Sequence, residues 1–164
     1  MVTLALDQAL QTTGVSVMKD GELIKYDTFT IPAYKSIEIR LGEIWNKLND
    51  LYHEYQFEYV FFEDIQQQRG NVETFKKLAY CQAAILLWCY FNEVKYSILS
   101  PSHWRKVLKD KYKVAFGRSR EEQKKMAQAL VKDIYDLEVS TDIADSNCIH
   151  EAGLIEYCDN RSAF

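Results

Sequence analysis

The order of the apolar segments restricts the fold of this chain more than any other feature of its sequence. Apolar runs over residues 2–6, 15–18 and 23–29 have the length and alternation of β-strands. Asp20 and Gly21 separate the second run from the third, and Asp-Gly between two such runs is typical of a β-hairpin. The first third of the chain is therefore predicted to be a meander of three antiparallel strands.

Helix-like and strand-like segments alternate along the rest of the chain. The predicted elements are helices over residues 36–55 and 72–91, strands over 59–62 and 94–99, a helix that begins at Ser100-Pro101, a basic loop over 111–117, and helices over 118–135 and 142–157. This order predicts an α/β fold with a mixed five-stranded sheet, three antiparallel strands and then two parallel ones, flanked by helices. All of residues 1–164 are expected to form a single domain.

The composition is that of a folded protein with reduced cysteines. Apolar residues make up 48% of the chain, which favours a packed core over disorder. The longest apolar stretch, residues 78–91, is interrupted by Tyr80 and Gln82 and is too short to span a membrane. A cytoplasmic location is therefore expected. The four cysteines form no CxxC pair and the three histidines complete no zinc spacing, so packed thiols are favoured over a zinc site or a disulfide.

Charge is distributed unevenly along the chain. The net charge of −4 argues against a nucleic-acid-binding protein, yet residues 104–125 carry a net charge of +6 and the remainder carries −10. An asymmetry of this size can form a local anion-binding face on an acidic protein. The alternative is an ordinary solvated face of a helix.

Four carboxylates stand at positions from which they could converge. Asp7 ends the first predicted strand and Glu63 ends the fourth, so both emerge at one edge of the sheet if these strands are neighbours. Asp142 and Asp145 are three residues apart at the start of the last helix and therefore share a face. Converging carboxylates repel one another unless cations neutralise them. Oxygen ligands without His or Cys suit Mg²⁺ or Mn²⁺.

Each of these acids also has an ordinary structural explanation. Asp7 could begin a turn, and Glu63 could belong to a surface pair at a strand end. Asp142 could cap the last helix, and Asp145 could interact with its dipole. Two acids at strand ends together with an Asp-x-x-Asp at the start of the last helix are a more specific signal than any single position. Two cations about 4 Å apart at such a site can activate a water and stabilise the leaving oxygen of a phosphodiester.

The acids lie in four short motifs, which are Ala5-Leu6-Asp7-Gln8-Ala9 with Thr13-Gly14, Phe62-Glu63-Asp64, Leu99-Ser100-Pro101 and Asp142-Ile143-Ala144-Asp145. These motifs resemble those of the RuvC-type Holliday junction resolvases of the RNase H-like superfamily, and the compact chain looks most like the phage-borne members. Their order and spacing match over essentially the whole chain. The resemblance implies a homodimer that binds a four-way DNA junction, each subunit cutting one strand by two-metal hydrolysis, with no organic cofactor and no membrane.

The resemblance also assigns roles to residues. It implies that Asp7, Glu63, Asp142 and Asp145 are catalytic and bind two Mg²⁺ ions, which Mn²⁺ can replace. The expected DNA-binding residues are Arg105, Lys106, Arg118, Arg120, Lys124, Lys125, Gln66 and Arg69. Bacterial relatives carry an aromatic residue three positions after the catalytic Glu, where this chain has Gln66. An enzyme that also nicks forks and other branched DNA is therefore a reasonable hypothesis.

Other functions share parts of this pattern. RNase H activity on RNA–DNA hybrids uses the same carboxylate chemistry, and a non-catalytic junction-binding protein could share the fold, although it would have little reason to keep a costly cluster of charges. An actin-like or sugar-kinase-like nucleotide fold would need glycine-rich phosphate loops, which six dispersed glycines do not supply. Two local questions stay open: Tyr112 and Phe116 either stack on bases or anchor the basic loop, and the helix over residues 72–91 is either core or a dimer surface.

Overall fold

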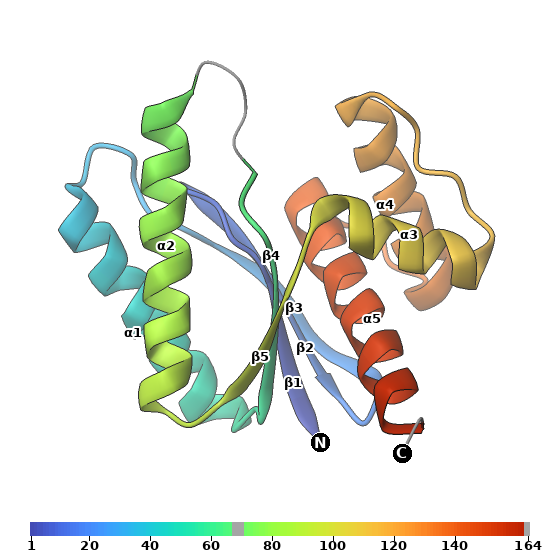
Figure 1. Cartoon of the computed structure of the whole chain (residues 1–164), viewed down its shortest axis with the longest axis horizontal. Coiled ribbons are helices and arrows are strands. Elements are labelled where there is room, and N and C mark those ends of the chain that lie inside the picture. The colour runs from blue at the N-terminus through green and yellow to red at the C-terminus, as the bar shows by residue number, and fades with distance from the viewer. Residues whose placement is uncertain (67–70, 163–164) are drawn as a thin grey trace.

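The computed structural model describes residues 1–66 and 71–162, in which a five-stranded sheet lies between two layers of helices (Figure 1). The strands are β1 (Val2–Asp7), β2 (Thr12–Lys19), β3 (Glu22–Thr30), β4 (Tyr59–Glu63) and β5 (Lys95–Leu99). The helices are α1 (Ile37–Tyr55), α2 (Val72–Phe91), α3 (Pro101–Tyr112), α4 (Arg120–Tyr135) and α5 (Thr141–Ser162). None of the helices in these residues is long and apolar enough to cross a membrane.

The sheet has the strand order β3-β2-β1-β4-β5. The β1–β2 and β2–β3 pairs are antiparallel, whereas the β1–β4 and β4–β5 pairs are parallel. At the β2–β3 turn, Asp20 and Gly21 have φ angles of 52° and 86°, the left-handed conformation that an Asp-Gly hairpin turn uses. The predicted mixed sheet and the predicted order of the elements are both confirmed.

The carboxyl ends of β1 and β4 lie side by side. The two strands are parallel neighbours, with Leu6 opposite Phe62, so the residues that follow, Asp7 and Glu63, leave the sheet at the same edge. This is the arrangement that the sequence predicts for the two acids, and it follows from a parallel ladder in which both strands run in one direction.

The helices divide between the two faces of the sheet (Figure 1). Helices α1 and α2 pack against each other on one face. On the other face α5 contacts β1, β2 and β4, and α3 and α4 pack against α5. The basic residues of α3 and α4 therefore lie on the same side of the sheet as α5, which carries Asp142 and Asp145.

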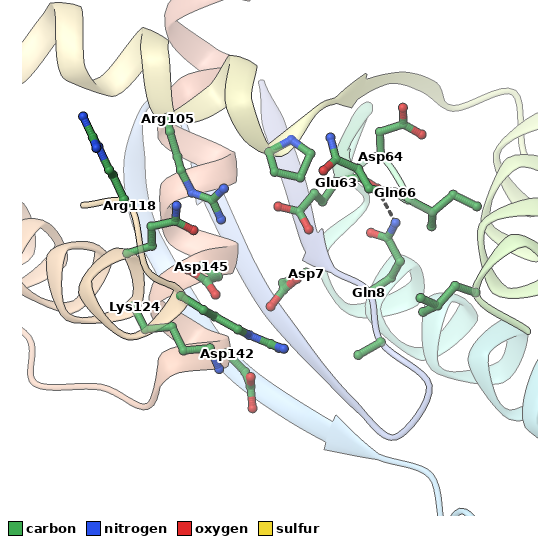
Figure 2. Close-up of a pocket in the computed structure, with 16 residues that line it drawn as sticks. Asp7, Gln8, Glu63, Asp64, Gln66, Arg105, Arg118, Lys124, Asp142 and Asp145 are labelled. Atoms are coloured by element: carbon green, nitrogen blue, oxygen red, sulfur yellow. Dashed lines mark hydrogen bonds between the residues drawn. The ribbon is translucent and has the colours of Figure 1, made fainter. Parts of the chain in front are cut away.

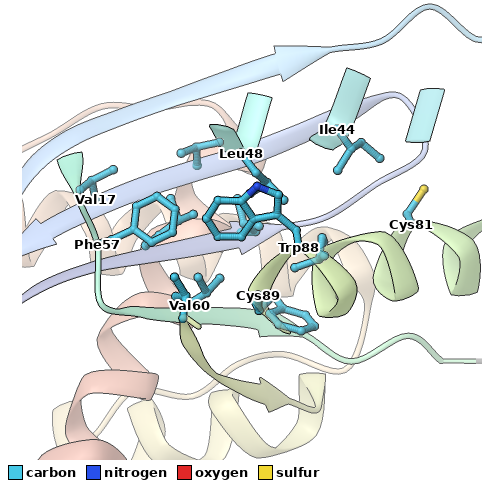
Figure 3. Close-up of a cluster of buried hydrophobic side chains, with 14 of the residues drawn as sticks. Val17, Ile44, Leu48, Phe57, Val60, Cys81, Trp88 and Cys89 are labelled. Atoms are coloured by element: carbon cyan, nitrogen blue, oxygen red, sulfur yellow. The ribbon is translucent and has the colours of Figure 1, made fainter. Parts of the chain in front are cut away.

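Each face of the sheet has its own apolar core, because successive residues of a strand point in opposite directions. Leu6 and Phe62 lie in the cluster beneath α1 and α2, which also contains Trp88 (Figure 3). Ala5 and Phe61 lie in the cluster beneath α5. Full burial of one large apolar side chain is worth about 1.5–3 kcal/mol, so these two clusters supply most of the free energy that holds the helices on the sheet.

Helix α5 is seated on the sheet by a buried histidine and a glycine. His150 is fully buried, and its ring nitrogens are hydrogen-bonded to Thr3 Oγ1 at 2.6 Å and to Ser16 Oγ at 2.8 Å. Gly153 lies against Phe61, and a Cβ atom at this position would be 2.3 Å from the aromatic ring. These contacts set the distance and the register of α5 relative to β1, β2 and β4.

Several helix ends differ from the sequence prediction: α4 begins at Arg120 rather than at residue 118, and α5 ends at Ser162 rather than near residue 157. Helix α3 continues to Tyr112, so the predicted loop over residues 111–117 begins two residues late. Helix α5 begins at Thr141, and the Ile143 N–H donates to Ser140 Oγ at 3.4 Å. Ser140 therefore caps α5, and the capping explanation of Asp142 is wrong. Cys81, Cys89 and Cys148 are buried free thiols, as expected.

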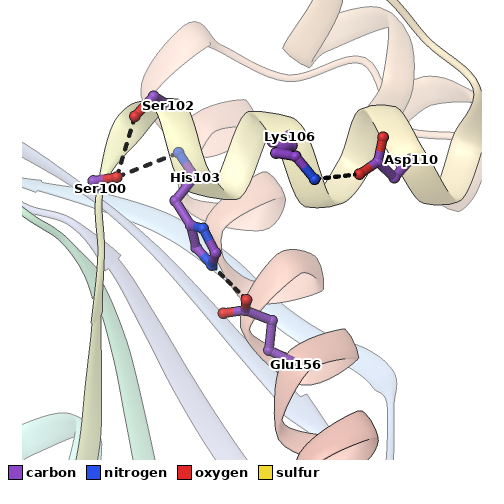
Figure 4. A network of polar contacts seen from close by, with 6 residues as sticks. All are labelled: Ser100, Ser102, His103, Lys106, Asp110 and Glu156. Atoms are coloured by element: carbon purple, nitrogen blue, oxygen red, sulfur yellow. Dashed lines mark hydrogen bonds and ion pairs between the residues drawn. The ribbon is translucent and has the colours of Figure 1, made fainter.

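The start of α3 is held by its own cap and by a contact to α5 (Figure 4). Ser100 Oγ accepts a hydrogen bond from the His103 N–H at 3.3 Å, and Pro101 occupies the first turn, which confirms the predicted helix start. The His103 ring is hydrogen-bonded to Glu156 of α5. This contact ties α3 to the helix that carries Asp142 and Asp145.

Candidate active site

The carboxyl ends of β1 and β4 and the segments around α3, α4 and the start of α5 surround a polar cavity of about 510 Å³ (Figure 2). Its lining includes all four carboxylates that the sequence singles out, namely Asp7, Glu63, Asp142 and Asp145. They come from β1, β4 and α5, segments that lie far apart in the chain. The tertiary structure thus brings the predicted acids to one place.

A glycine controls how closely α5 approaches the sheet at this cavity. Gly14 of β2 pairs with Asp7 of β1. A Cβ atom on Gly14 would lie 2.0 Å from the carbonyl oxygen of Asp142 and 3.3 Å from the Ser146 side chain. Any larger residue would push the first turn of α5 away, so Gly14 sets the separation between Asp7 and the two aspartates of the helix.

Burial and mutual repulsion dominate the electrostatics of the carboxylates. Burial raises the pKa of Asp7 well above its usual value, and the charges of Asp145, Glu63 and Asp142 add to this. Burial and then the charge of Glu63 raise the pKa of Asp145 to about 6. Burial also raises the pKa of Glu63, against a hydrogen bond from Trp104 that lowers it. The nearby cationic side chains therefore do not offset the burial of these carboxylates and their mutual repulsion.

The donor set fits a hard divalent cation. No group of three or more His, Cys, Asp or Glu side chains within residues 1–66 and 71–162 is arranged to hold a metal ion as it stands. The cavity nevertheless offers carboxylate oxygens, the donors that Mg²⁺ and Mn²⁺ prefer. A cation beside them would relieve the repulsion that raises the pKa values of Asp7 and Asp145.

Several of the predicted DNA-binding residues line the same cavity. These are Arg105, Arg118, Arg120, Lys124 and Gln66. Lys124 reaches the start of α5, where its Nζ donates to Thr141 Oγ1 at 3.2 Å. A cation-rich wall therefore faces the carboxylates, which suits a polyanion whose phosphate is held between the two.

Two predicted basic residues lie elsewhere and one cannot be placed. Lys106 and Lys125 do not line the cavity, and they form ion pairs with Asp110 at 2.8 Å and with Glu121 at 2.7 Å, four residues away on their own helices. This is the solvated helical face that the sequence leaves open as an alternative. Arg69 lies outside the described residues.

Two residues of the site have no signal in the sequence beyond their positions beside predicted residues. The Trp104 indole N–H donates to Glu63 Oε1 at 2.8 Å. Gln8, which follows Asp7, donates from Nε2 to the backbone oxygen of Glu63, and its buried Oε1 has no partner among the described residues. Both side chains fix the position of Glu63, one through its carboxylate and the other through its main chain.

Tyr112 and Phe116 anchor the basic segment, residues 104–125, to the rest of the protein. The Tyr112 hydroxyl donates to Glu151 of α5, as does the Tyr135 hydroxyl of α4 at 2.8 Å. The Phe116 ring packs edge-on against Trp104, with ring centroids 5.5 Å apart. Of the two explanations that the sequence leaves open, the structure supports anchoring.

Comparison with known proteins finds a similar sequence and similar structures. No protein-family model matches the chain. The crossover junction endodeoxyribonuclease RuvC of Dictyoglomus thermophilum is 24% identical over 153 residues, which cover 89% of this chain and 91% of the relative. RuvC of Thermus thermophilus in complex with a Holliday junction substrate is similar in structure, with a TM-score of 0.73, 18% identity, and coverage of 93% of this chain and 91% of that one. The chain has a RuvC-like fold.

A yeast mitochondrial protein also has a similar structure. The yeast mitochondrial Holliday junction resolvase Ydc2 matches with a TM-score of 0.58 and 16% identity, over 92% of this chain and 76% of that chain. At these identities the structural likeness describes the fold.

Proposed function

We propose that this protein is a structure-selective endodeoxyribonuclease of the RuvC type, which resolves Holliday junctions by hydrolysis of phosphodiester bonds. The observation that carries the proposal is the cavity in which Asp7, Glu63, Asp142 and Asp145 face a wall of arginine and lysine side chains. A carboxylate cluster alone would suit a structural cation, and a basic wall alone would suit any polyanion. Their combination in one cavity suits phosphodiester cleavage.

The four carboxylates would hold divalent cations, Mg²⁺ or in its place Mn²⁺, two per site. When bound, the cations supply the activation of the attacking water and the neutralisation of charge on the leaving oxygen. Arg105, Arg120 and Lys124 bind the phosphates of the strand to be cut and hold it against the carboxylates.

The substrate is branched DNA rather than one strict structure. Gln66, which is exposed, lines the cavity at the position where bacterial relatives carry an aromatic side chain. An amide cannot stack between bases as an aromatic ring does. We therefore expect forks and three-way branches to be cut as well as four-way junctions.

The active form is a homodimer, with one active site in each subunit, and each subunit is a single domain. A junction has two strands to be cut symmetrically, and a two-fold dimer presents two identical sites to them. The exposed apolar residues of α2, Leu87, Tyr90 and Phe91, supply a surface for this contact.

The test is nicking of end-labelled four-way junctions, forks, linear duplexes and RNA–DNA hybrids, with Mg²⁺ or with EDTA, by the wild type and by Asp7→Asn. We expect paired, cation-dependent nicks on the junction. Asp7→Asn should lose cleavage by several orders of magnitude while still binding the junction, because the substitution removes one of the four carboxylates and leaves the basic side chains of the cavity intact.

Three results would contradict the proposal, each in its own way. Degradation of the hybrid without cleavage of any branched DNA would assign the site to RNase H chemistry. Junction binding without cleavage under all cation conditions would make the protein a non-catalytic binder. Normal cleavage by Asp7→Asn would show that the active site is not this cavity.

A further inference from the structure

Trp104, in the basic segment (residues 104–125), is hydrogen-bonded to Glu63, one of the four carboxylates. Its side chain is 1% exposed, and its indole N–H donates to Glu63 Oε1 at 2.8 Å. The two residues are 41 positions apart and belong to α3 and β4. A buried N–H that meets a carboxylate forms a short, charge-assisted hydrogen bond with a defined direction.

The indole ring is held from two sides. The Phe116 ring meets it at right angles, with an interplanar angle of 89° and centroids 5.5 Å apart. The Arg105 guanidinium carbon lies 4.5 Å from the centre of the indole ring. Edge-on aromatic pairs and cation–π contacts both restrict the orientation of a ring. The indole therefore cannot turn away from Glu63 without breaking its contacts with both neighbours.

We propose that Trp104 is a positioning residue for Glu63. Its N–H occupies Oε1 and holds the glutamate in one rotamer, which leaves Oε2 to act toward the cavity. This inference rests on the proposed function, in which Glu63 holds a divalent cation. A partner that orients a ligating carboxylate typically contributes about 10–100-fold to metal affinity or activity.

Phe116 extends this connection to the basic segment. It lies between α3 and α4, close in sequence to Arg118 and Arg120, which line the cavity. A change in the position of this segment moves the ring that supports Trp104. The Phe116 ring thus supports Trp104 from the segment that carries Arg118 and Arg120.

The chain contains a matched control for this interaction. Trp88 is also fully buried, and its indole N–H donates at the same distance, 2.8 Å, to Asn49 Oδ1. The acceptor is a neutral amide, and the bond joins α2 to α1, which lie on the opposite face of the sheet from α3. Trp88→Phe removes the same atoms and an indole hydrogen bond of the same length as Trp104→Phe, without touching the cavity.

The first experiment needs neither metal nor substrate. In ¹H–¹⁵N correlation spectra of the metal-free protein, the three indole N–H signals are assigned with Trp→Phe variants. Glu63→Gln replaces the charged acceptor of Trp104 by a neutral one, so the Trp104 signal should move upfield while the Trp88 signal stays in place. A Trp104 signal that does not move would overturn the proposal. This spectrum retains Trp104 and is informative even if Trp104→Phe folds poorly.

The second experiment compares junction cleavage by Trp104→Phe and Trp88→Phe over a range of Mg²⁺ concentrations, at a temperature where both are folded. We expect Trp104→Phe to need more Mg²⁺ and to lose about 10–100-fold in cleavage rate, with junction affinity unchanged. Trp88→Phe should cleave like the wild type. Phe116→Leu, which keeps the indole, should show a smaller loss in the same direction. Equal activity of the two Trp→Phe variants would overturn the proposal.

The two proposals fail in different ways. A wild-type protein that cleaves no branched DNA would overturn the proposed function, and the shift of the Trp104 signal in Glu63→Gln would still show whether Trp104 holds Glu63. A wild-type protein that cleaves junctions while Trp104→Phe does so with unchanged Mg²⁺ dependence would overturn the role of Trp104 and leave the function standing.

Discussion

Two basic residues of α4, Arg120 and Lys125, have different surroundings, although nothing in the sequence distinguishes them. Arg120 lines the cavity, whereas Lys125, five residues later, is exposed and paired with Glu121 at 2.7 Å. An exposed ion pair of this kind contributes little. A guanidinium beside a phosphate adds affinity that depends on salt.

Arg120→Ala should weaken junction binding and reduce the slope of log affinity against log salt by about one, because one phosphate contact is lost. Lys125→Ala is the control and should leave both quantities nearly unchanged. The measurement is a binding titration at several salt concentrations with the cation omitted. Equal effects of the two substitutions would mean that α4 acts through its overall charge rather than through Arg120.

Gly14→Ala should damage both stability and cleavage, because the new methyl group would meet the carbonyl oxygen of Asp142. Overpacking of this kind costs about 1–3 kcal/mol. Gly42→Ala in α1, where a new methyl group would meet nothing within 4 Å, is the control and should lower neither stability nor cleavage. Urea unfolding and junction cleavage, both measured where the variants are folded, separate the two. Normal cleavage by Gly14→Ala would show that the separation between β2 and α5 is not critical.

At the level of elements, α5 is the part of the fold on which the site most depends, because it carries two of the four acids. Its contact with β1 and β2 includes the buried His150, hydrogen-bonded to Thr3 and Ser16. Burial lowers the pKa of His150 from 6.5 to about 3. The imidazole is therefore neutral in the folded protein under ordinary conditions.

This histidine should make stability depend on pH. Below about pH 6.5 the unfolded chain binds a proton at His150 that the folded protein does not bind until about pH 3, so the free energy of unfolding falls as the pH falls through this range. Between pH 7 and pH 5 the His150 contribution to this fall is about 2 kcal/mol. Urea unfolding at several pH values, compared between wild type and His150→Gln, measures it.

The comparison with His150→Gln isolates the histidine. Asp145, whose pKa is raised to about 6, acts in the opposite direction, because its folded form gains a proton as the pH falls through that value. It is present in both proteins and cancels in the difference. An identical pH dependence of the two proteins would show that His150 is not the group that titrates on unfolding.

On the scale of the whole molecule, the cavity and the apolar surface belong to different sides of the protein. A groove of about 370 Å³ lined by α1 and α2 residues, among them Trp45 and Leu87, lies on the side away from α5. Leu87, Tyr90 and Phe91 are 53%, 76% and 67% exposed. An apolar surface of this kind on a folded protein marks an interaction site, which agrees with the proposed dimer.

Leu87→Glu should convert the dimer to a monomer, because it places a charge in the centre of the apolar contact. Ile24→Glu, at a 46% exposed apolar position on β3, is the control and should leave the dimer intact. Sedimentation velocity measures the change, and the monomer should make single rather than paired nicks in the junction. A monomeric wild type that still makes paired nicks would contradict the role of this surface.

The sequence by itself determined the elements and their order, and it predicted which four acids lie together. Alternation, helical periodicity, the Asp20-Gly21 turn and the Ser100-Pro101 helix start are local signals, and they predict local structure. The convergence of Asp7 and Glu63 was also within reach, because parallel neighbouring strands bring their carboxyl ends together.

Only the tertiary structure decided which side chains meet across elements. The bond from Trp104 to Glu63 spans 41 residues and that from His150 to Thr3 spans 147, and no local pattern specifies either. The same is true of Arg120 and Lys125, which share a helix but face the cavity and the solvent respectively. Local propensity acts over a few residues, whereas the orientation of a side chain in a site depends on how whole helices pack on the sheet.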